Sequence, residues 1–136
     1  MERKAGMVVA LPLVLALVVA AAAGSAVTNV TVGKAQTLMK ERAGKADFVI
    51  LDVRTSEEFA EGHIAGAVNL DVQGRDFERK IRALDRKKSY LVYCRTGNRS
   101  RKATVAMEAL GFRAIFHMNE GIVKWKQQNL PLTPPS

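Results

Sequence analysis

The sequence predicts an α/β fold in which a five-stranded, mostly parallel sheet is covered by helices on both faces. Five short apolar stretches alternate with stretches of helical periodicity, and no tight hairpin signal joins two consecutive strands. The stretch 47–53 is rich in Phe, Val, Ile and Leu, as expected of a strand that is buried on both faces. The chain has 136 residues, of which 48% are hydrophobic and 25% are charged. These values indicate one folded domain and argue against a disordered or coiled-coil protein.

The expected elements follow one another in a regular order. We expect strands at residues 27–32, 47–53, 67–70, 89–93 and 114–118, and helices at 34–42, from 56 onward, 76–84, 100–110 and 122–128. Ser56 precedes two glutamates, and acidic residues in a first turn are typical of a helix N-terminus. Ala103, Met107 and Leu110 recur at helical spacing, and Gly111 marks the end of their helix.

The first 26 residues are predicted to lie outside the fold, which leaves residues 27–136 as the domain. Arg3 and Lys4 precede an uncharged stretch, residues 5–23, which ends in a series of small side chains. A basic start, an apolar centre and a small-residue end are typical of a secretory signal peptide.

Cleavage of this segment is expected after Ala23 or Ala26, and the sequence does not choose between them. The uncharged stretch is also barely long enough to cross a bilayer, so an uncleaved N-terminal anchor stays open as the alternative. Both interpretations predict an exported domain. We expect the bacterial periplasm, because the domain is small and a single cysteine cannot form an internal disulfide.

The single cysteine, Cys94, excludes an internal disulfide framework and a cysteine-cluster metal site. The two histidines, His63 and His117, are too few and too far apart in the sequence to indicate a metal centre. In an oxidising compartment an unpaired cysteine indicates a reactive thiol or an intermolecular disulfide. The commoner alternative is a buried cysteine that packs as a small apolar side chain.

The neighbours of Cys94 favour a reactive thiol. Cys94 opens a loop between the fourth expected strand and the next helix, and ligand sites in open α/β sheets form beyond the carboxyl ends of strands. The start of a helix presents backbone N–H groups to an anion, and both helix N-termini and cations such as Arg95 and Arg99 lower thiol pKa values. Gly97 permits the curvature of a loop around one atom, and Ser100 is a candidate cap for the helix. The candidate site consists of the nucleophile Cys94 and the substrate-binding residues Arg95, Thr96, Gly97, Asn98, Arg99 and Ser100.

Four segments between residues 31 and 131 resemble, in the same order, the motifs of single-domain rhodaneses, which are thiosulfate sulfurtransferases. They are residues 51–54 with 57–59, residues 62–69, residues 93–100, and Gly121 with Trp125 and the Leu130-Pro131 pair. The resemblance implies a five-stranded parallel sheet, a persulfide on the cysteine and a loop whose amides hold the outer sulfur. It also implies that Asp52 and Arg54 lie near the active face as supporting polar residues.

One departure from the family pattern is Glu120-Gly121, where rhodaneses often have paired glycines before the last helix. We expect this substitution to alter the rim of the pocket and to leave the loop after Cys94 unchanged.

The leading functional prediction is a sulfurtransferase that works without a metal or an organic cofactor. Cys94 would take sulfane sulfur from a small anionic donor, thiosulfate or a persulfide, and pass it to cyanide or to an acceptor thiol. The alternatives are a non-enzymatic binding or sulfur-carrier module and, less favoured, a phosphatase or arsenate reductase. Phosphatase loops resemble Cys-x5-Arg, whereas here Arg99 is the fifth residue after Cys94 and Ser100 is the sixth. The shorter loop indicates a ring sized for one sulfur atom.

The formal net charge of +8 fits a small anionic substrate, because a basic field raises the encounter rate of anions. The predicted domain keeps 19 basic and 12 acidic residues, and 11 basic residues but three acidic ones lie within 75–102. The basic residues of 79–88 are interpreted as a solvated helix face without a substrate role. No nucleic-acid partner is expected, since aromatic residues are not interleaved with the cations, and a membrane is a partner only if the N-terminal segment is uncleaved.

Several other conspicuous residues are interpreted as structural. His63 lies near a turn, where a structural hydrogen bond is the favoured role, and Trp125 is assigned to core packing. Tyr93 is expected to point into a sheet face. For Asp52 and Arg54 we favour an ion pair that shapes the loop over direct binding of substrate.

Overall fold

The computed structural model describes residues 2–10 and 24–134, in which five strands form a parallel sheet of order β1-β5-β4-β2-β3. The strands are β1 (Val27–Asn29), β2 (Phe48–Asp52), β3 (Val68–Asn69), β4 (Ser89–Tyr93) and β5 (Ala114–His117). The helices are α1 (Val32–Glu41), α2 (Ser56–Glu61), α3 (Phe77–Ala83), α4 (Asn98–Ala109) and α5 (Gly121–Gln127). The predicted fold class and the predicted order of elements are confirmed.

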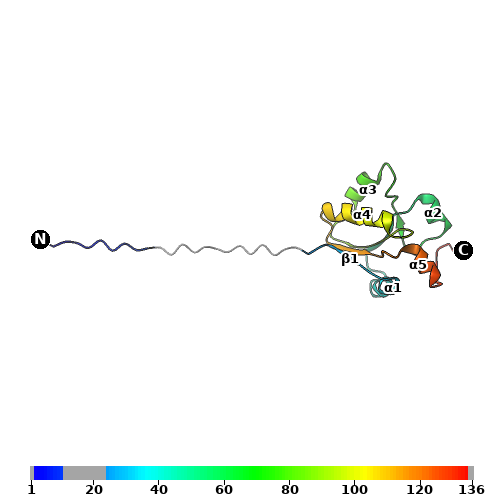
Figure 1. Ribbon diagram of the computed structural model, residues 1–136, viewed down its shortest axis with the longest axis horizontal. Coiled ribbons are helices and arrows are strands. Elements are labelled where there is room, and N and C mark those ends of the chain that lie inside the picture. The colour runs from blue at the N-terminus through cyan, green and yellow to red at the C-terminus, as the bar shows by residue number, and fades with distance from the viewer. Residues whose placement is uncertain (1, 11–23, 135–136) are drawn as a thin grey trace.

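Helices cover both faces of the sheet: α3 and α4 lie on one face, and α1 lies on the other (Figure 1). Alternate residues of the central strand β4 point to opposite faces. Tyr90 and Val92 pack in the core that includes residues of α3 and α4, while Leu91 and Tyr93 pack in the core that includes residues of α1 and α5. These four residues have exposed fractions of 1% or less, so β4 is fully buried from Tyr90 up to the residue that follows it, Cys94.

Two helix starts differ from the prediction for local reasons. Thr31 caps α1 by accepting a hydrogen bond from the Lys34 amide at 3.1 Å, which ends the first strand earlier than residue 32. Helix α4 begins at Asn98, directly after Gly97, whose φ of 102° lies in the left-handed region. Ser100 therefore lies within the first turn of α4, and the prediction that it caps this helix is wrong.

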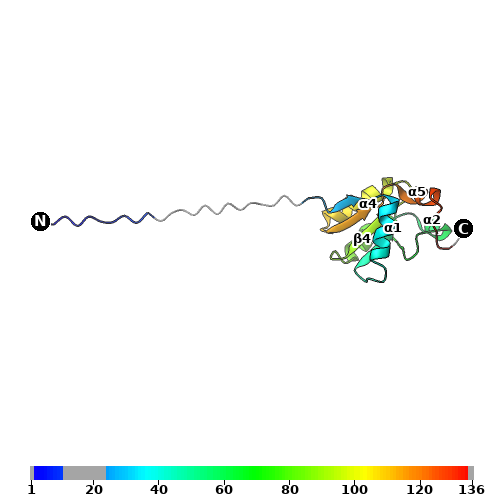
Figure 2. The ribbon, with the colours of Figure 1, turned by 90° about the horizontal axis from the view of Figure 1, so that it is seen from below.

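The strand register gathers the functional residues at one end of the sheet. Asp52 of β2 lies opposite Tyr93 of β4, and Val92 of β4 lies opposite His117 of β5. Helices α2 and α5 are at the same end of the molecule in two perpendicular views (Figures 1 and 2). The carboxyl ends of β2, β4 and β5 thus meet under these two helices, with Cys94 directly after β4.

The fold begins slightly before the predicted boundary at residue 27. Ser25 Oγ and the Ala26 amide both donate to a carboxylate oxygen of Glu108, at 2.9 and 2.7 Å, and the Ala26 carbonyl accepts from the Ile115 amide at 3.0 Å. Ser25 and Ala26 therefore belong to the domain. Residues 11–23, which form most of the apolar part of the expected signal peptide, lie outside the described residues, and no described helix is long and apolar enough to span a bilayer.

Candidate active site

Cys94 lies at the carboxyl end of β4 with its side chain almost fully enclosed, at an exposed fraction of 1%. Its carbonyl accepts a hydrogen bond from the Ile122 amide at 2.9 Å, and the next carbonyl, that of Arg95, accepts from the Val123 amide at 3.2 Å. The loop after Cys94 is thereby held by the first turn of α5. These bonds hold the backbone of Cys94 and Arg95 in place.

Two glycines allow the loop and the α5 start to approach each other. A Cβ atom on Gly97 would overlap the carbonyl oxygen of Asn119, and a Cβ atom on Gly121 would overlap the backbone of Arg95. Both glycines also have a positive φ, of 102° and 71°. The narrow turn around the sulfur therefore depends on glycine at both positions.

Glu120, the departure from the family pattern, does not form the rim of the site. Its carboxylate accepts a hydrogen bond from the Val32 amide at 3.1 Å, at the N-terminus of α1. A carboxylate in this position satisfies a free amide of the helix start and interacts favourably with the helix dipole. The predicted alteration of the pocket rim is thus wrong, because the Glu120 side chain binds the start of α1. The next residue, Gly121, allows the backbone to approach that of Arg95 closely.

The sulfur of Cys94 is surrounded by uncharged hydrogen-bond donors. The Gly97 amide donates to Sγ at 3.1 Å, and the Ser100 hydroxyl lies 3.2 Å from Sγ. Burial works to raise the pKa of the Cys94 thiol, but the Ser100 hydroxyl and the amides of Ser100, Gly97 and Thr96 outweigh it, so that the pKa lies below its ordinary value. The loop therefore stabilises a thiolate.

The two arginines beside the thiol differ from the prediction. Arg99 forms a two-point ion pair with Glu58 of α2, at 2.6 and 2.9 Å, and does not donate a hydrogen bond to the sulfur. The Ser100 hydroxyl and the backbone amides contribute most to lowering the pKa of Cys94, while Arg99 interacts with Cys94 through its charge and not through a hydrogen bond. Arg95 is exposed and lines a hollow beside the loop together with Arg54, Glu58, Ile122 and Lys126.

Glu58 is set in place by the start of α2. Thr55 caps this helix by accepting from the Glu58 amide at 3.2 Å, and the Thr55 hydroxyl donates to the Glu58 carboxylate at 3.2 Å. The hydrogen bond from Arg99, with these contacts, lowers the pKa of Glu58 to about 2. The sequence analysis did not single out Glu58 as a site residue, although its position in the first turn of a capped helix was the available signal.

Asp52 and Arg54 form the buried ion pair that the sequence analysis favoured. Arg54 Nη2 lies 2.6 Å from Asp52 Oδ2, and the side chains are 4% and 0% exposed. The guanidinium also donates to the Gly62 carbonyl at 2.8 Å and lies 5.8 Å from the centre of the Tyr93 ring. This pair joins the end of β2 to the segment after α2, and so positions α2 and its Glu58.

The remaining structural interpretations are confirmed. The His63 ring stacks on Phe59 with 3.6 Å between ring centres, and its Nδ1 is 2.8 Å from the Phe59 carbonyl. Trp125 is buried and donates to the Pro131 carbonyl at 3.0 Å, while the Tyr93 hydroxyl accepts from the Ile64 amide at 3.1 Å.

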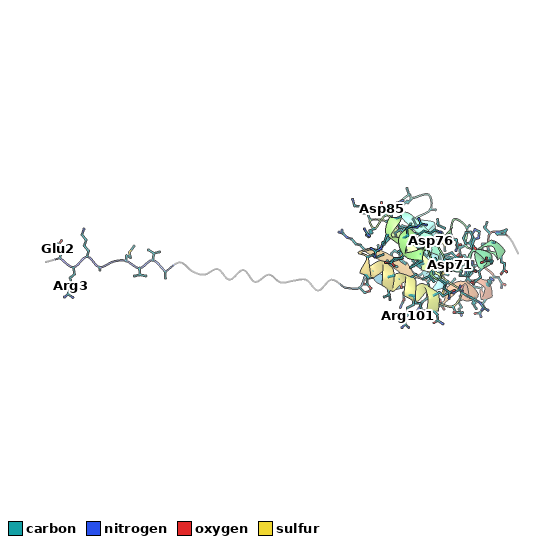
Figure 3. All side chains as sticks on the ribbon, turned by 90° about the horizontal axis from the view of Figure 1, so that it is seen from above. Glu2, Arg3, Asp71, Asp76, Asp85 and Arg101 are labelled. Atoms are coloured by element: carbon teal, nitrogen blue, oxygen red, sulfur yellow. The ribbon has the colours of Figure 1, made fainter. Side chains whose placement is uncertain are left out.

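The basic face of α3 agrees with its interpretation as a solvated surface. Arg79 pairs with Asp76 at 3.4 Å and Arg82 pairs with Glu78 at 2.8 Å, all with side chains more than half exposed. Asp76, which lies on this surface, is labelled in Figure 3. Such exposed pairs contribute little to stability.

Sequence reasoning missed His117, the last residue of β5. Its Nε2 lies 2.6 Å from the Ser100 hydroxyl oxygen, which itself lies 3.2 Å from the sulfur of Cys94, and His117 is buried. The available signal was a polar residue near the carboxyl end of a strand next to β4 in a parallel sheet. Among the residues that the structure describes, no three His, Cys, Asp or Glu side chains cluster as a metal site.

A family model described as a rhodanese-like domain matches residues 35–128, which include the Cys94 loop, the Asp52–Arg54 pair and the α5 start. The chain belongs to this family. A solved structure of a rhodanese-related protein from Thermoplasma volcanium is 29% identical, with a TM-score of 0.59, and the match covers 70% of this chain and 90% of that one.

Three relatives are similar in sequence to this rhodanese-like domain. A sulfurtransferase of Allochromatium vinosum is 26% identical over 100 residues, which are 74% of this chain and 92% of the relative. Thiosulfate sulfurtransferase 16, a chloroplastic protein of Arabidopsis thaliana, is 33% identical over 91 residues, which are 60% of this chain and 76% of the relative. The tRNA uridine(34) hydroxylase of Cytophaga hutchinsonii is 37% identical over 90 residues, or 64% of this chain, but the match spans only 28% of the hydroxylase.

Proposed function

We propose that this rhodanese-like domain transfers sulfane sulfur through a persulfide on Cys94. The observation that carries the proposal is the environment of the sulfur: the Gly97 amide and the Ser100 hydroxyl both lie within hydrogen-bond distance of it, in a loop that opens a helix. Donors in this arrangement stabilise a thiolate before the reaction, and they stabilise a negatively charged outer sulfur after it. The similarity to proteins named sulfurtransferases supports the same chemistry.

With thiosulfate as donor, the reaction has two displacement steps. The Cys94 thiolate attacks the outer sulfur, a new S–S bond forms, and the S–S bond of thiosulfate breaks, so that sulfite leaves with the bonding electron pair. Cyanide or a thiolate then attacks the outer sulfur of the Cys94 persulfide. The products are thiocyanate or a new persulfide, and the Cys94 thiolate is regenerated.

The enclosure of Cys94 favours a donor with a terminal sulfur. Because the side chain is only 1% exposed, the loop admits a single atom more readily than a tetrahedral anion. Thiosulfate and persulfides both present such an atom. The hollow beside the loop is lined by Arg95 and Lys126, whose positive charges support binding of an anionic donor, and by Glu58 and Glu61, of which Glu58 is paired with Arg99.

The same geometry disfavours the phosphatase alternative. A phosphatase loop needs an arginine free to bind the equatorial oxygens of a phosphoryl group. Here Arg99 is engaged by both carboxylate oxygens of Glu58.

The decisive experiment is the intact mass of the purified domain after incubation with thiosulfate. We expect a gain of one sulfur atom on Cys94, loss of that gain on adding cyanide, and formation of thiocyanate. Cys94→Ser is expected to abolish both the mass gain and the turnover, since a serine cannot form the persulfide. Absence of sulfur loading with every donor tested, with or without hydrolysis of a phosphate ester, would refute the proposal in favour of a binding module or a phosphatase.

We also propose that the domain is exported to the bacterial periplasm, with cleavage after Ala23. The hydrogen bonds of Ser25 and Ala26 to Glu108, and of Ala26 to Ile115, support this position over cleavage after Ala26, which would remove both residues. We expect the mature protein from a periplasmic extract to begin at Gly24 by mass. A mature chain that begins at Val27, or retention of the full chain in the membrane fraction, contradicts this part of the proposal.

A further inference from the structure

Ser100 connects the reactive sulfur to a buried imidazole. Its hydroxyl oxygen lies 3.2 Å from Cys94 Sγ and 2.6 Å from His117 Nε2. The three residues come from three elements, namely the residue after β4, the first turn of α4 and the end of β5. The hydroxyl thus bridges two groups that both exchange protons.

Hydrogen-bond accounting at Ser100 permits two proton arrangements. The hydroxyl has one proton and three neighbours that can accept it: Cys94 Sγ, His117 Nε2 and, at 3.1 Å, the Gly97 carbonyl. When the thiol is protonated, its S–H can donate to Ser100 Oγ while the hydroxyl donates to a neutral imidazole. When the thiolate is present, a protonated imidazole can donate to Ser100 Oγ while the hydroxyl donates to the sulfur.

We propose that Ser100 and His117 form a relay that removes the proton from the Cys94 thiol. In this step the S–H bond breaks and its proton bonds to Ser100 Oγ, while the original Ser100 proton moves to His117 Nε2. A thiol and a neutral imidazole become a thiolate and an imidazolium, with no other reactant. The proton returns by the same path when the thiol is regenerated. His117 touches Ser100 and not the sulfur, so it is a positioning residue that acts through Ser100.

The surroundings of His117 suit a proton acceptor. Burial lowers the pKa of His117, so the ring is neutral before the transfer, and the imidazolium formed in the relay is accompanied by the Cys94 thiolate, whose opposite charge offsets the cost of burying it. The ring also lines a second hollow together with Thr96, Asn98 and Asn119. This hollow shares no lining residue with the one that contains Arg95, so the two hollows are distinct.

The charged and titratable groups around His117 are few. Arg101 and Glu108 of α4 line the same hollow as His117, while its register partners Asn29 on β1 and Val92 on β4 are uncharged. Glu108 is already engaged by Ser25 and Ala26. Cys94 is therefore the titratable group to which His117 is linked through Ser100.

The test measures the rate of alkylation of Cys94 by iodoacetamide against pH. For His117→Gln we expect the midpoint to rise by about one pH unit and the rate at pH 7 to fall about tenfold, with an unchanged plateau at high pH. Ser100→Ala is expected to raise the midpoint as well, and adding His117→Gln to it is expected to change nothing further, because the relay is already broken. His63→Gln is the matched control and should leave the profile unchanged.

A second measurement follows the wild-type protein directly, with Cys94→Ser as its reference. The ring resonances of His117 should shift with the same midpoint as alkylation, and this step should be absent in Cys94→Ser. The relay is refuted if His117→Gln folds with an unchanged midpoint, or if the His117 resonances do not respond when Cys94 ionises. The relay deepens the proposed function, whose nucleophile is this thiolate. Alkylation does not require sulfur transfer, so either proposal can fail without the other.

Discussion

The carboxyl ends of β2 and β4 lie side by side, yet they carry different electrostatic arrangements. After β2, the carboxylate of Asp52 and the guanidinium of Arg54 neutralise each other at 2.6 Å in a site closed to water. After β4, the sulfur of Cys94 accepts a hydrogen bond from the Gly97 amide and lies 3.2 Å from the Ser100 hydroxyl, and neither of these groups carries a full charge. One strand end is a closed ion pair, and the other holds a group whose negative charge remains available for reaction.

This difference separates structural from chemical polar groups in the domain. A buried ion pair resists change, because removing either partner leaves an uncompensated charge in a medium of low dielectric constant. Neutral donors around a thiolate lower the pKa of the thiol and still allow the charge to move to a substrate atom in the transition state. The Arg99–Glu58 pair beside the loop is also an ion pair, but its side chains are 20% and 28% exposed, so it is only partly buried.

The largest effect on stability is expected from breaking the closed pair. Asp52→Asn leaves the buried Arg54 guanidinium without its counter-charge and should lower the free energy of unfolding by about 3 kcal/mol, as measured by urea denaturation. Asp76→Asn is the matched control, because Asp76 pairs with Arg79 on the exposed face of α3 (Figure 3) and such pairs often contribute nothing measurable. Equal unfolding midpoints for the two variants would contradict the assignment of Asp52 and Arg54 as the structural strand end.

The fold could be predicted from the sequence because each strand and helix has a local signal. The apolar stretch 47–53 and the helical stripe of Ala103, Met107 and Leu110 fixed the type and order of their elements, and the structure contains both. Boundaries were less accurate where a single backbone angle decides them. Helix α4 starts two residues earlier than predicted, because Gly97 before it adopts a left-handed φ. The spacing of apolar residues in the sequence does not indicate that backbone angle.

The candidate site could be predicted only as far as the loop itself extends. Cys94 and its amides are neighbours in sequence, so the cradle followed from the position of the loop before a helix. Glu58 and His117 lie 41 and 17 residues from the loop residues that they contact. Whether an arginine faces a sulfur or a distant carboxylate depends on packing between helices, which the loop sequence does not contain.

The smallest effect is expected from the partly exposed ion pair beside the loop. Glu58 has a folded-state pKa of about 2, below the value near 4.5 of an unperturbed glutamate. The pair therefore stabilises the fold fully above the unfolded-state pKa, and this contribution is lost as the pH falls from 4.5 toward 2. The Arg99 and Glu58 side chains are 20% and 28% exposed, so the contribution of the pair is expected to be below about 1 kcal/mol.

Glu58→Gln removes this titration and should flatten the stability curve between pH 4.5 and pH 2 relative to wild type, as measured by thermal unfolding across that range. The same variant sharpens the contrast between the two strand ends. If amides and the Ser100 hydroxyl control the thiol, freeing Arg99 from Glu58 should leave the alkylation midpoint of Cys94 nearly unchanged, with at most a small decrease from the unpaired positive charge. A decrease of the midpoint by a full pH unit or more would instead show that Arg99 can activate the sulfur once it is released from Glu58. The thiolate would then depend on a charged arginine, and the contrast between the ion-paired end of β2 and the uncharged donors around Cys94 after β4 would be wrong.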